Sequence, residues 1–589
     1  MDAAQLSKFR KLIVSKNLDY YLILTQDEHN SEYVSDADKR REYVTGFTGS
    51  AGTAIVGRNY CELATDGRYW LQAADQLGSD WVLRKEGHPG IIPWNKAISI
   101  RAKEEGAIVG VDPKLISHET ASQMLANGTQ LKAVEPNLVD KIWTSKPAEP
   151  SSPIFSLPLD KTGASSKSKI ADLRFYISSK NRDAIVISAL DQIAWLLNLR
   201  GSDIEYNPVF KSYCIVTLSE VRLYLNLGRE VPELSSKIKV CDYDLLFKDV
   251  KDLSKAGMKI EVSSKSSWAI VLAAGENAVI SDSEFIANAK AIKNKVEIEG
   301  ARKAQLYCGV SIVKTLSWLN KELKADKEVT EYEVSEKLQS FRLSLPDFRG
   351  PSFETISSSG ANAAIIHYTP SPNTCSYVNK NAVFLMDSGC QFLYGTTDTT
   401  RTCWFSDKEC PSNIKRAYTL VLKGHLALAN AQFPPRTSGY QLDALARQFL
   451  WHEGLDYVHS TGHGVGSYLN VHEGPVGIGP DAKRWGAELK VGCLISNEPG
   501  YYKPKEFGIR IESLIVVQPK NGNKTKNTDF LTFETITLVP FDRNLIDVHL
   551  LTNDEINSIN SYHAHVKEKL EPLLSDEDLE YLLYHVSPL

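Results

Sequence analysis

The chain lacks any apolar run that approaches the roughly 20 residues needed to span a bilayer. Its first residues also lack the apolar stretch of roughly 7–15 residues that a secretory signal contains. Neither sign of charge dominates, because 67 basic and 72 acidic residues leave a formal charge of -5 at pH 7. We therefore expect a soluble protein with no membrane and no nucleic-acid partner.

Cysteine is scarce and follows no pattern. The nine cysteines of the 589-residue chain are scattered without a Cys-x-x-Cys pair, and their number is odd. Such a distribution is typical of reduced thiols packed as small hydrophobic groups rather than of a disulfide framework. Because reduced thiols suit the cytosol, we expect a cytoplasmic protein.

Several catalytic signatures are also missing. The chain has no Gly-x-Ser-x-Gly elbow, no P-loop and no Gly-x-Gly-x-x-Gly dinucleotide fingerprint. His452-Glu453 lacks the second histidine that completes the common zinc-protease signature. A catalytic function would therefore have to rest on other residues.

The pattern of apolar runs and breakers divides the chain into three parts. Residues 1–153 and 154–292 each alternate short apolar runs with helical stretches, which predicts two α/β domains. Four prolines between residues 145 and 169 indicate a linker. A long amphipathic helix near Lys293 begins a third domain, residues 293–589, in which Thr330 and Glu333 predict a capping box. The first two parts share a rhythm that suggests an internal duplication.

Histidines gather in one segment of the third domain. Four of the thirteen histidines fall within 21 residues that also contain Gly462, Gly464 and Gly466; they are His452, His459, His463 and His472. The glycines on both sides of His463 favour an irregular backbone that approaches another group closely. A single histidine is usually structural, but this cluster favours a functional site.

Four acids lie in apolar or glycine-rich strands, where an unpaired carboxylate is costly. Asp387 ends an apolar run and Asp398 follows 11 positions later, so a hairpin could bring them together. Glu498 and Glu512 lie in two further strand-like segments. Each acid alone could be an ion-pair partner or a turn cap, but with one histidine the four carry the charge that balances two divalent cations. Oxygen-rich ligation with one imidazole favours manganese, with zinc or cobalt as alternatives.

The segments that carry these residues resemble the aminopeptidase P branch of the pita-bread metallopeptidases, and most closely its three-domain cytosolic eukaryotic members. The matching segments are Asp387-Ser388-Gly389, Gly395-Thr396-Thr397-Asp398-Thr399-Thr400-Arg401-Thr402, His459-Ser460-Thr461-Gly462-His463-Gly464-Val465-Gly466, Asn470-Val471-His472-Glu473-Gly474-Pro475, Asn497-Glu498-Pro499-Gly500-Tyr501-Tyr502 and Gly508-Ile509-Arg510-Ile511-Glu512. Thr45-Gly46-Phe47-Thr48-Gly49-Ser50-Ala51-Gly52 and Thr65-Asp66-Gly67-Arg68-Tyr69 extend the resemblance into the first domain. It implies two creatinase-like α/β domains followed by a pita-bread catalytic domain.

The resemblance also implies which residues act. The metal ligands would be Asp387, Asp398, His463, Glu498 and Glu512, with manganese the usual occupant. His367, His459, His472 and Glu498 would be catalytic, and Arg68, His367 and His472 would contact substrate. The family is dimeric, so Trp451, on the apolar side of a predicted helix, is either a core residue or part of a dimer contact.

The activity implied is removal of the first residue from peptides with proline at position two. A metal-bridging hydroxide would attack the carbonyl before proline, and Glu498 would take the proton and pass it to the proline nitrogen. His472 or His367 would help to stabilise the oxyanion. Tyr501 would help to shape the proline pocket.

Four alternatives share parts of this pattern. A prolidase would leave a middle domain of about 140 residues unexplained, and a methionine aminopeptidase would lack both N-terminal domains. Creatinase-like enzymes do not keep the metal ligands, whereas this chain keeps all five. Some pita-bread domains bind histones or other proteins without catalysis, but in those the ligand set decays.

Overall fold

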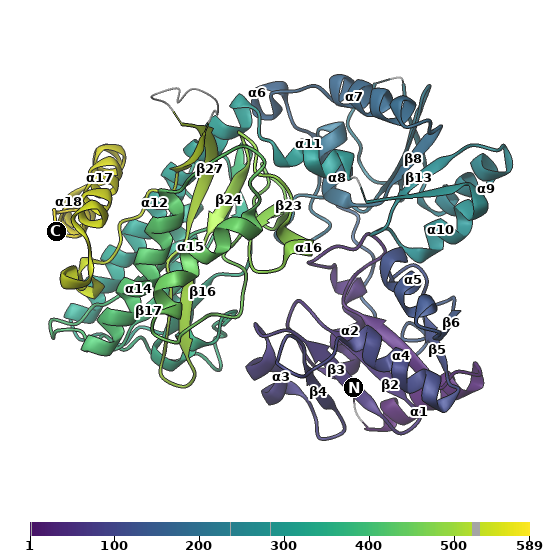
Figure 1. Cartoon of the computed structure of the whole chain (residues 1–589), viewed down its shortest axis with the longest axis horizontal. Coiled ribbons are helices and arrows are strands. Elements are labelled where there is room, and N and C mark those ends of the chain that lie inside the picture. Colours follow the sequence, from purple (N-terminus) through teal and green to yellow (C-terminus); the bar gives the residue numbers. More distant parts are fainter. Residues whose placement is uncertain (2, 236, 283, 521–529) are drawn as a thin grey trace. The chain divides into compact units, whose positions relative to one another are not determined.

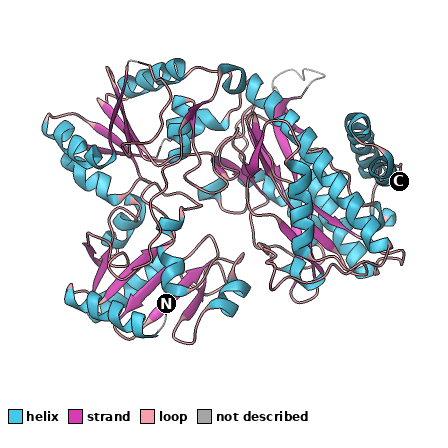
Figure 2. Ribbon diagram, turned by 180° about the vertical axis from the view of Figure 1, so that it is seen from behind, coloured by secondary structure: helices cyan, strands magenta, loops and turns pink. Residues whose placement is uncertain are grey.

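The computed structural model describes residues 1, 3–235, 237–282, 284–520 and 530–589 (Figure 1). The chain forms two units: unit 1 contains residues 1–158 and 164–286, and unit 2 contains residues 159–163 and 287–589. Helices flank the strands in both units (Figure 2). The division into two units does not test the three predicted domains, so the boundaries near residues 153 and 292 stay predictions.

Unit 1 is built from two six-stranded sheets with the same topology. The first has the order β4-β3-β2-β1-β5-β6 and the second β12-β11-β10-β8-β13-β14. In each sheet the central strand pairs antiparallel on one side and parallel on the other. The strands are β1 (Tyr20–Leu24), β2 (Thr53–Gly57), β3 (Cys61–Thr65), β4 (Val82–Lys85), β5 (Ile108–Val111), β6 (Gln130–Ala133), β8 (Ala184–Ile187), β10 (Tyr213–Thr217), β11 (Val221–Leu225), β12 (Ile238–Asp242), β13 (Ile260–Ser263) and β14 (Ala278–Ser281), with β7 (Phe155–Ser156) and β9 (Leu199–Arg200) as a separate pair.

The helices of unit 1 follow the strands in a similar order in both repeats, except that α3, between β3 and β4, has no counterpart among the described residues between β11 and β12. The central strands β1 and β8 are buried along their whole length, which explains their continuous apolar sequences. The helices are α1 (Ala3–Ser15), α2 (Arg40–Thr45), α3 (Trp70–Gln76), α4 (Trp94–Glu105), α5 (His118–Ala126), α7 (Ser166–Ser179), α8 (Leu190–Leu197), α9 (Leu246–Lys255) and α10 (Trp268–Ala274).

The two repeats meet through equivalent residues. Ser117 and Ser267 precede the corresponding helices α5 and α10, and they pair with each other in an antiparallel bridge. The flanking bonds are reciprocal: His118 N donates to Ser266 O and Trp268 N donates to Ile116 O, both at 2.8 Å. A contact made by the same position on both halves indicates an internal pseudo-two-fold axis. The structure thus confirms the internal duplication.

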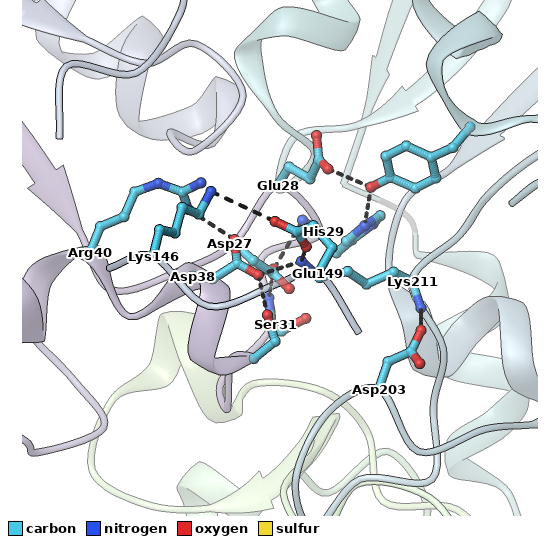
Figure 3. A network of polar contacts seen from close by, with 12 residues as sticks. Asp27, Glu28, His29, Ser31, Asp38, Arg40, Lys146, Glu149, Asp203 and Lys211 are labelled. Atoms are coloured by element: carbon cyan, nitrogen blue, oxygen red, sulfur yellow. Dashed lines mark hydrogen bonds and ion pairs between the residues drawn. The ribbon is translucent and has the colours of Figure 1, made fainter. Parts of the chain in front are cut away.

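A network of charged side chains also joins the two repeats of unit 1 (Figure 3). Asp38 accepts from Arg40 Nη1 at 2.8 Å, and Lys211 from the second repeat pairs with the same carboxylate. Lys211 also pairs with Glu149 at 2.6 Å. Arg40 pairs with Asp140 at 2.8 Å. Each of these acids therefore has a basic partner.

Unit 2 surrounds its strands with long helices, of which α12, α14 and α15 are labelled in Figure 1. Its sheets have the orders β15-β18-β19, β16-β17-β20, β21-β28-β27-β24-β22-β23 and β25-β26. Helix α11 (Phe285–Ala291) spans the boundary between the units. The helices of unit 2 are α6 (Leu159–Thr162), α12 (Lys295–Lys324), α13 (Glu331–Arg342), α14 (Ser412–Ala429), α15 (Gly439–Trp451), α16 (Ala482–Trp485), α17 (Asn553–Leu570) and α18 (Asp576–His585). The strands are β15 (Phe348–Pro351), β16 (Ile356–Ser359), β17 (Phe384–Asp387), β18 (Cys390–Phe392), β19 (Gly395–Thr396), β20 (Thr400–Cys403), β21 (Gln432–Phe433), β22 (Gly462–Gly464), β23 (Glu473–Ile478), β24 (Leu494–Asn497), β25 (Gly500–Lys503), β26 (Phe507–Arg510), β27 (Ser513–Pro519) and β28 (Leu531–Thr535).

Local signals in the sequence account for the starts of helices α12 and α13. Asn294 caps α12 and forms a capping box with Glu297. The predicted box of Thr330 and Glu333 is confirmed at the start of α13. Each box satisfies backbone donors that the first turn of a helix would otherwise leave without partners.

Three further expectations can be compared with the structure. The nine cysteines are free thiols, and eight of them are buried. Trp451 ends α15 with 48% of its surface exposed, so the interpretation of Trp451 as a core residue is wrong. Within the described parts of the chain, no helix has both the length and the apolar character required to cross a membrane.

Candidate metal centre

Asp387 and Asp398 lie at adjoining ends of two paired strands. β17 and β20 run antiparallel, and Asp387 pairs with Thr400, two residues after Asp398. The connection passes through β18 and β19 instead of a single hairpin turn. The structure therefore brings the two acids together, as their spacing predicts, by a longer route.

Glu498 and Glu512 are brought to the same place by the large sheet of unit 2. β24 pairs with β27 so that Asn497 lies opposite Ser513. Glu498 directly follows Asn497, and Glu512 directly precedes Ser513. The backbone N–H of Glu512 donates to Thr400 O at 3.1 Å, which ties this sheet to the strand after Asp398. The four acids therefore come from the ends of four strands.

His463 is the middle residue of the short strand β22, and its neighbours must be glycine. A Cβ at Gly462 would overlap the backbone oxygen of Ser496, and one at Gly464 would overlap that of Glu473. The flanking strands therefore approach His463 more closely than any side chain would permit. This is the close approach that the glycine pattern predicts.

The ligand atoms of these residues form three overlapping groups in which all atoms lie within 4.8 Å of one another. The groups are Asp387, Asp398 and Glu512; His463, Glu498 and Glu512; and Asp398, His463 and His472. His463 Nε2 lies 3.3 Å from Asp398 Oδ2 and 3.4 Å from Glu498 Oε1. All five candidate ligands, with His472 beside them, therefore surround one small region.

Three of the carboxylates in this region each have one buried oxygen without the partner that a buried polar atom needs. Asp387 Oδ1, Asp398 Oδ1 and Glu512 Oε1 are buried and have no hydrogen-bond partner among the residues that the structure describes. Burial, and then the charges of Asp387 and Glu498, raises the pKa of Asp398 well above its usual range. Burial, and then the charge of Asp398, does the same to the pKa of Glu512. Divalent cations would supply the missing partners, so the donor set fits a metal centre.

The orientation of His463 supports the same conclusion. Its Nδ1 lies 3.0 Å from Gly464 O, which can only accept, so Nδ1 carries the proton in the neutral ring. The lone pair of Nε2 then faces two carboxylates, a repulsive arrangement that a cation between them would reverse. This use of one ring nitrogen to fix the other is typical of metal-binding histidines.

Arg510 and Tyr502 connect the acids to His459. Arg510 Nη2 donates to Asp387 Oδ2 at 2.6 Å, and Arg510 Nη1 donates to the Tyr502 hydroxyl at 2.8 Å. His459 Nδ1 lies 2.8 Å from Ser460 O and must carry the proton, so Tyr502 donates to His459 Nε2 at 2.9 Å. Neither Arg510 nor Tyr502 is among the residues that the sequence predicts to act at this site.

The alternation of side chains along a strand could have found both residues. Arg510 lies two positions before Glu512 and therefore shares its side. Tyr501 and Tyr502 are neighbours on β25 and point to opposite sides. Tyr501 packs near Phe507, with ring centroids 6.1 Å apart, whereas Tyr502 reaches His459. Tyr502 therefore takes the place beside the histidines that the sequence suggested for Tyr501.

His472 and His367 occupy different settings in unit 2. The rings of His472 and His463 lie 4.3 Å apart and nearly perpendicular. His367 is half-buried in the turn after η4 (Gly360–Ala364), which packs against β26. Arg68 lies in unit 1, where it pairs with Asp66 at 2.8 Å.

The loop that carries His367 is held by one buried carboxylate. Glu331, at the start of α13, accepts from the backbone N–H of Ser359 at 2.6 Å and of Ser376 at 2.9 Å. It also accepts from the hydroxyl of Tyr368, the neighbour of His367, at 2.6 Å. Glu331 cannot be recognised from the sequence, because its partners become its neighbours only in the folded chain.

Comparison with known proteins places this site in a family. Residues 299–519 match the model of metallopeptidase family M24, and residues 529–589 match the C-terminal region of peptidase M24. Residues 5–142 and 145–297 match two models of the creatinase/prolidase N-terminal domain. The fold is therefore two creatinase-type N-terminal domains followed by an M24 catalytic domain.

Relatives of similar length match nearly the whole chain. A probable Xaa-Pro aminopeptidase P of Talaromyces stipitatus is 44% identical over 98% of this chain and 90% of the relative. One of Aspergillus niger is 43% identical over 98% of this chain and 96% of the relative. The crystal structure of an X-prolyl aminopeptidase from Caenorhabditis elegans, described as a cytosolic enzyme with a di-nuclear active site, has a TM-score of 0.94 and 36% identity, and covers 100% of this chain and 99% of that one. The chain therefore belongs to metallopeptidase family M24 and, within it, to the aminopeptidase P branch.

Proposed function

We propose that the chain is a two-metal exopeptidase that releases the N-terminal residue from peptides with proline at position two. The metals would be held by Asp387, Asp398, His463, Glu498 and Glu512, and manganese is the proposed occupant. The observation that carries this proposal is the convergence of the four carboxylates on one another and on His463, which leaves one buried oxygen on each of three of them without a hydrogen-bond partner among the described residues. Oxygen-rich ligation of this kind favours manganese over softer ions.

The metal pair, when bound, supplies a hydroxide nucleophile and polarises the carbonyl that precedes proline. Glu498 would hold the proton released in the attack. Ser496 Oγ donates to Glu498 Oε1 at 3.0 Å, while Oε2 lies 4.0 Å from His459 Nδ1. Ser496 therefore fixes the carboxylate and leaves its second oxygen toward the histidine side of the site.

The reaction needs a proton at the proline nitrogen, because a tertiary amide leaves poorly without one. Glu498 would deliver the proton that it holds, acting first as base and then as acid. His472 and His367 would donate hydrogen bonds to the oxygen of the scissile carbonyl as it gains charge. His459, fixed by Tyr502, would line the proline side of the site.

The acid cluster also accounts for cleavage at the first residue only. The free amino group of a peptide would dock beside the acid cluster, where its N–H groups can donate to carboxylate oxygens. A peptide bond further along the chain has no such group beside it. The site therefore favours the first bond.

Three features of the proposal lie outside the acid cluster. Arg68 of unit 1 would contact the bound peptide. The chain would form a homodimer in which Trp451, whose exposed surface is unusual for a tryptophan, contributes to the contact. The enzyme would act in the cytoplasm, as the nematode relative is described to do.

The test is hydrolysis of an Xaa-Pro-Yaa tripeptide by metal-free protein to which Mn²⁺, Zn²⁺ or Co²⁺ is returned. We expect Mn²⁺ to restore release of the first residue, and Asp398→Ala to remain inactive with any metal. An Xaa-Pro dipeptide should be a poorer substrate. Preference for the dipeptide would instead indicate a prolidase, and no hydrolysis with any metal would indicate a binding role.

A further inference from the structure

Glu473, which follows His472, is buried against two lysines. Lys290 Nζ lies 2.6 Å from Glu473 Oε2, and Lys293 Nζ pairs with Glu473 Oε1. The three side chains are only 1–2% exposed. Lysine and glutamate are rarely buried to this extent unless they are paired. One carboxylate therefore holds two ammonium groups away from water.

Both lysines come from the segment through which the chain enters unit 2. Lys290 is in α11 and Lys293 precedes α12. Lys293 N donates to Gly492 O at 2.9 Å, and Ile292 forms an antiparallel bridge with Cys493. Lys293 Nζ also donates to Lys290 O at 2.9 Å, which fixes the two lysines relative to each other. The segment is thus fastened beside the start of β24, the strand that leads to Glu498.

The pairing of β22, which contains His463, with β23, which begins directly after His472, is irregular at Glu473. His463 pairs with Gly477, but the next residue, Gly464, pairs with Glu473, so residues 474–476 have no opposite partner. Such a bulge interrupts the ladder of hydrogen bonds that would otherwise fix the register. Glu473 is bonded in the chain to His472 and lies opposite the residue after His463.

We propose that Glu473, held by Lys290 and Lys293, is a positioning residue that fixes His472 against His463. The ion pairs replace the backbone bonds that the bulge removes, and they anchor the strand at the residue beside both histidines. This inference rests on the proposed function, in which His463 is a metal ligand and His472 contacts substrate. Neither lysine touches the reacting atoms.

The main variant is Lys293→Met, which keeps the length of the side chain and removes one of the two charges. Lys290 remains to pair with Glu473, so the protein should fold. Because the anchor is weakened, we expect Mn²⁺ affinity of the metal-free protein and kcat/KM for Xaa-Pro-Yaa each to fall by about 10–100-fold, the effect of losing a group that orients a ligand.

Lys423→Met is the matched control. Lys423 pairs with Glu555 at 2.6 Å, and their side chains are 11% and 17% exposed. The pair joins α14 to α17 and includes no neighbour of a candidate ligand. We expect both variants to lower the unfolding temperature of the metal-free protein, but only Lys293→Met to weaken Mn²⁺ binding, measured by calorimetry below both transitions.

Two outcomes would overturn the inference. If Lys293→Met binds Mn²⁺ within about twofold of the control, the cluster stabilises the fold without positioning the histidines. If wild-type protein binds none of Mn²⁺, Zn²⁺ and Co²⁺, both the inference and the proposed function fail. Wild-type protein that binds Mn²⁺ but does not cleave the tripeptide contradicts the proposed function alone, and the Mn²⁺ titrations still decide the role of Glu473.

Discussion

Unit 1 and unit 2 both bury acidic side chains, but the two units compensate for them in different ways. In unit 1, Asp38 pairs with Arg40 and Lys211, so the chain supplies its own cations. In unit 2, Asp398 and Glu512 face other acids and a histidine. Because an uncompensated buried charge is strongly destabilising, the second arrangement requires cations from outside the chain. The comparison separates a structural network from a metal centre.

Burial alone does not make that distinction. Asp27 of unit 1 is also buried, and burial raises its pKa although His29 lies near it. Its Oδ2 has no hydrogen-bond partner among the residues that the structure describes. Asp27 nevertheless belongs to a region rich in bases (Figure 3), whereas the orphaned oxygens of unit 2 converge on one another. Convergence of several acids is therefore the informative feature.

Asp398→Asn should have the largest effect on the difference between the two units, because it removes one charge from the acid cluster and keeps the shape of the side chain. We expect kcat/KM to fall by more than about 10³-fold, as for other residues that act as a unit in catalysis. The unfolding temperature of the metal-free variant should rise, since repulsion with Asp387 and Glu498 is relieved. Asp38→Asn in unit 1 is the control and should do the opposite: lower stability and unchanged kcat/KM. A lower unfolding temperature for metal-free Asp398→Asn would contradict the repulsion.

Lys211→Met tests the other side of the comparison. It leaves Asp38 and Glu149 without a shared cation, and breaking a buried pair costs about 3–5 kcal/mol. Lys211 and Asp38 are 5% and 7% exposed, so water cannot replace the lost partner. Chemical denaturation, monitored by hydrogen exchange of the residues of unit 1, should show this loss of stability. Lys248→Met, which breaks the exposed pair with Asp252, should cause no measurable change.

Tyr502→Phe tests the link between the acids and His459. The variant removes the hydroxyl that accepts from Arg510 and donates to His459, and we expect kcat/KM to fall about tenfold. Tyr501→Phe is a matched control, because Tyr501 is the adjacent tyrosine on the opposite side of β25. Equal effects of the two variants would show that the hydroxyl network does not support catalysis.

The sequence predicts the candidate ligands better than the residues that hold them. Asp387 ends an apolar run and His463 lies between glycines, and each of these is a local signal. Arg510 could be found by alternation from Glu512. Lys293, in contrast, is 180 positions from Glu473, and nothing local distinguishes it from other lysines. The two α/β repeats follow from local patterns, but the charges that join them depend on tertiary contacts between residues such as Asp38 and Lys211, 173 positions apart.

The smallest expected effect is the change in the free energy of unfolding when Asp38 is protonated at acidic pH. Burial by itself raises the pKa of this carboxyl, but Lys211 and Arg40 outweigh burial and hold the pKa well below its usual range. A depressed pKa in the folded state stabilises the protein above the unfolded value of about 3.9, and this stabilisation is lost as the pH falls below about 4. The difference in stability between wild type and Asp38→Asn should therefore be constant near neutral pH and shrink below about pH 4. Denaturant midpoints between pH 7 and pH 3 measure it, and a difference that grows on acidification would show that the two bases do not hold Asp38 ionised.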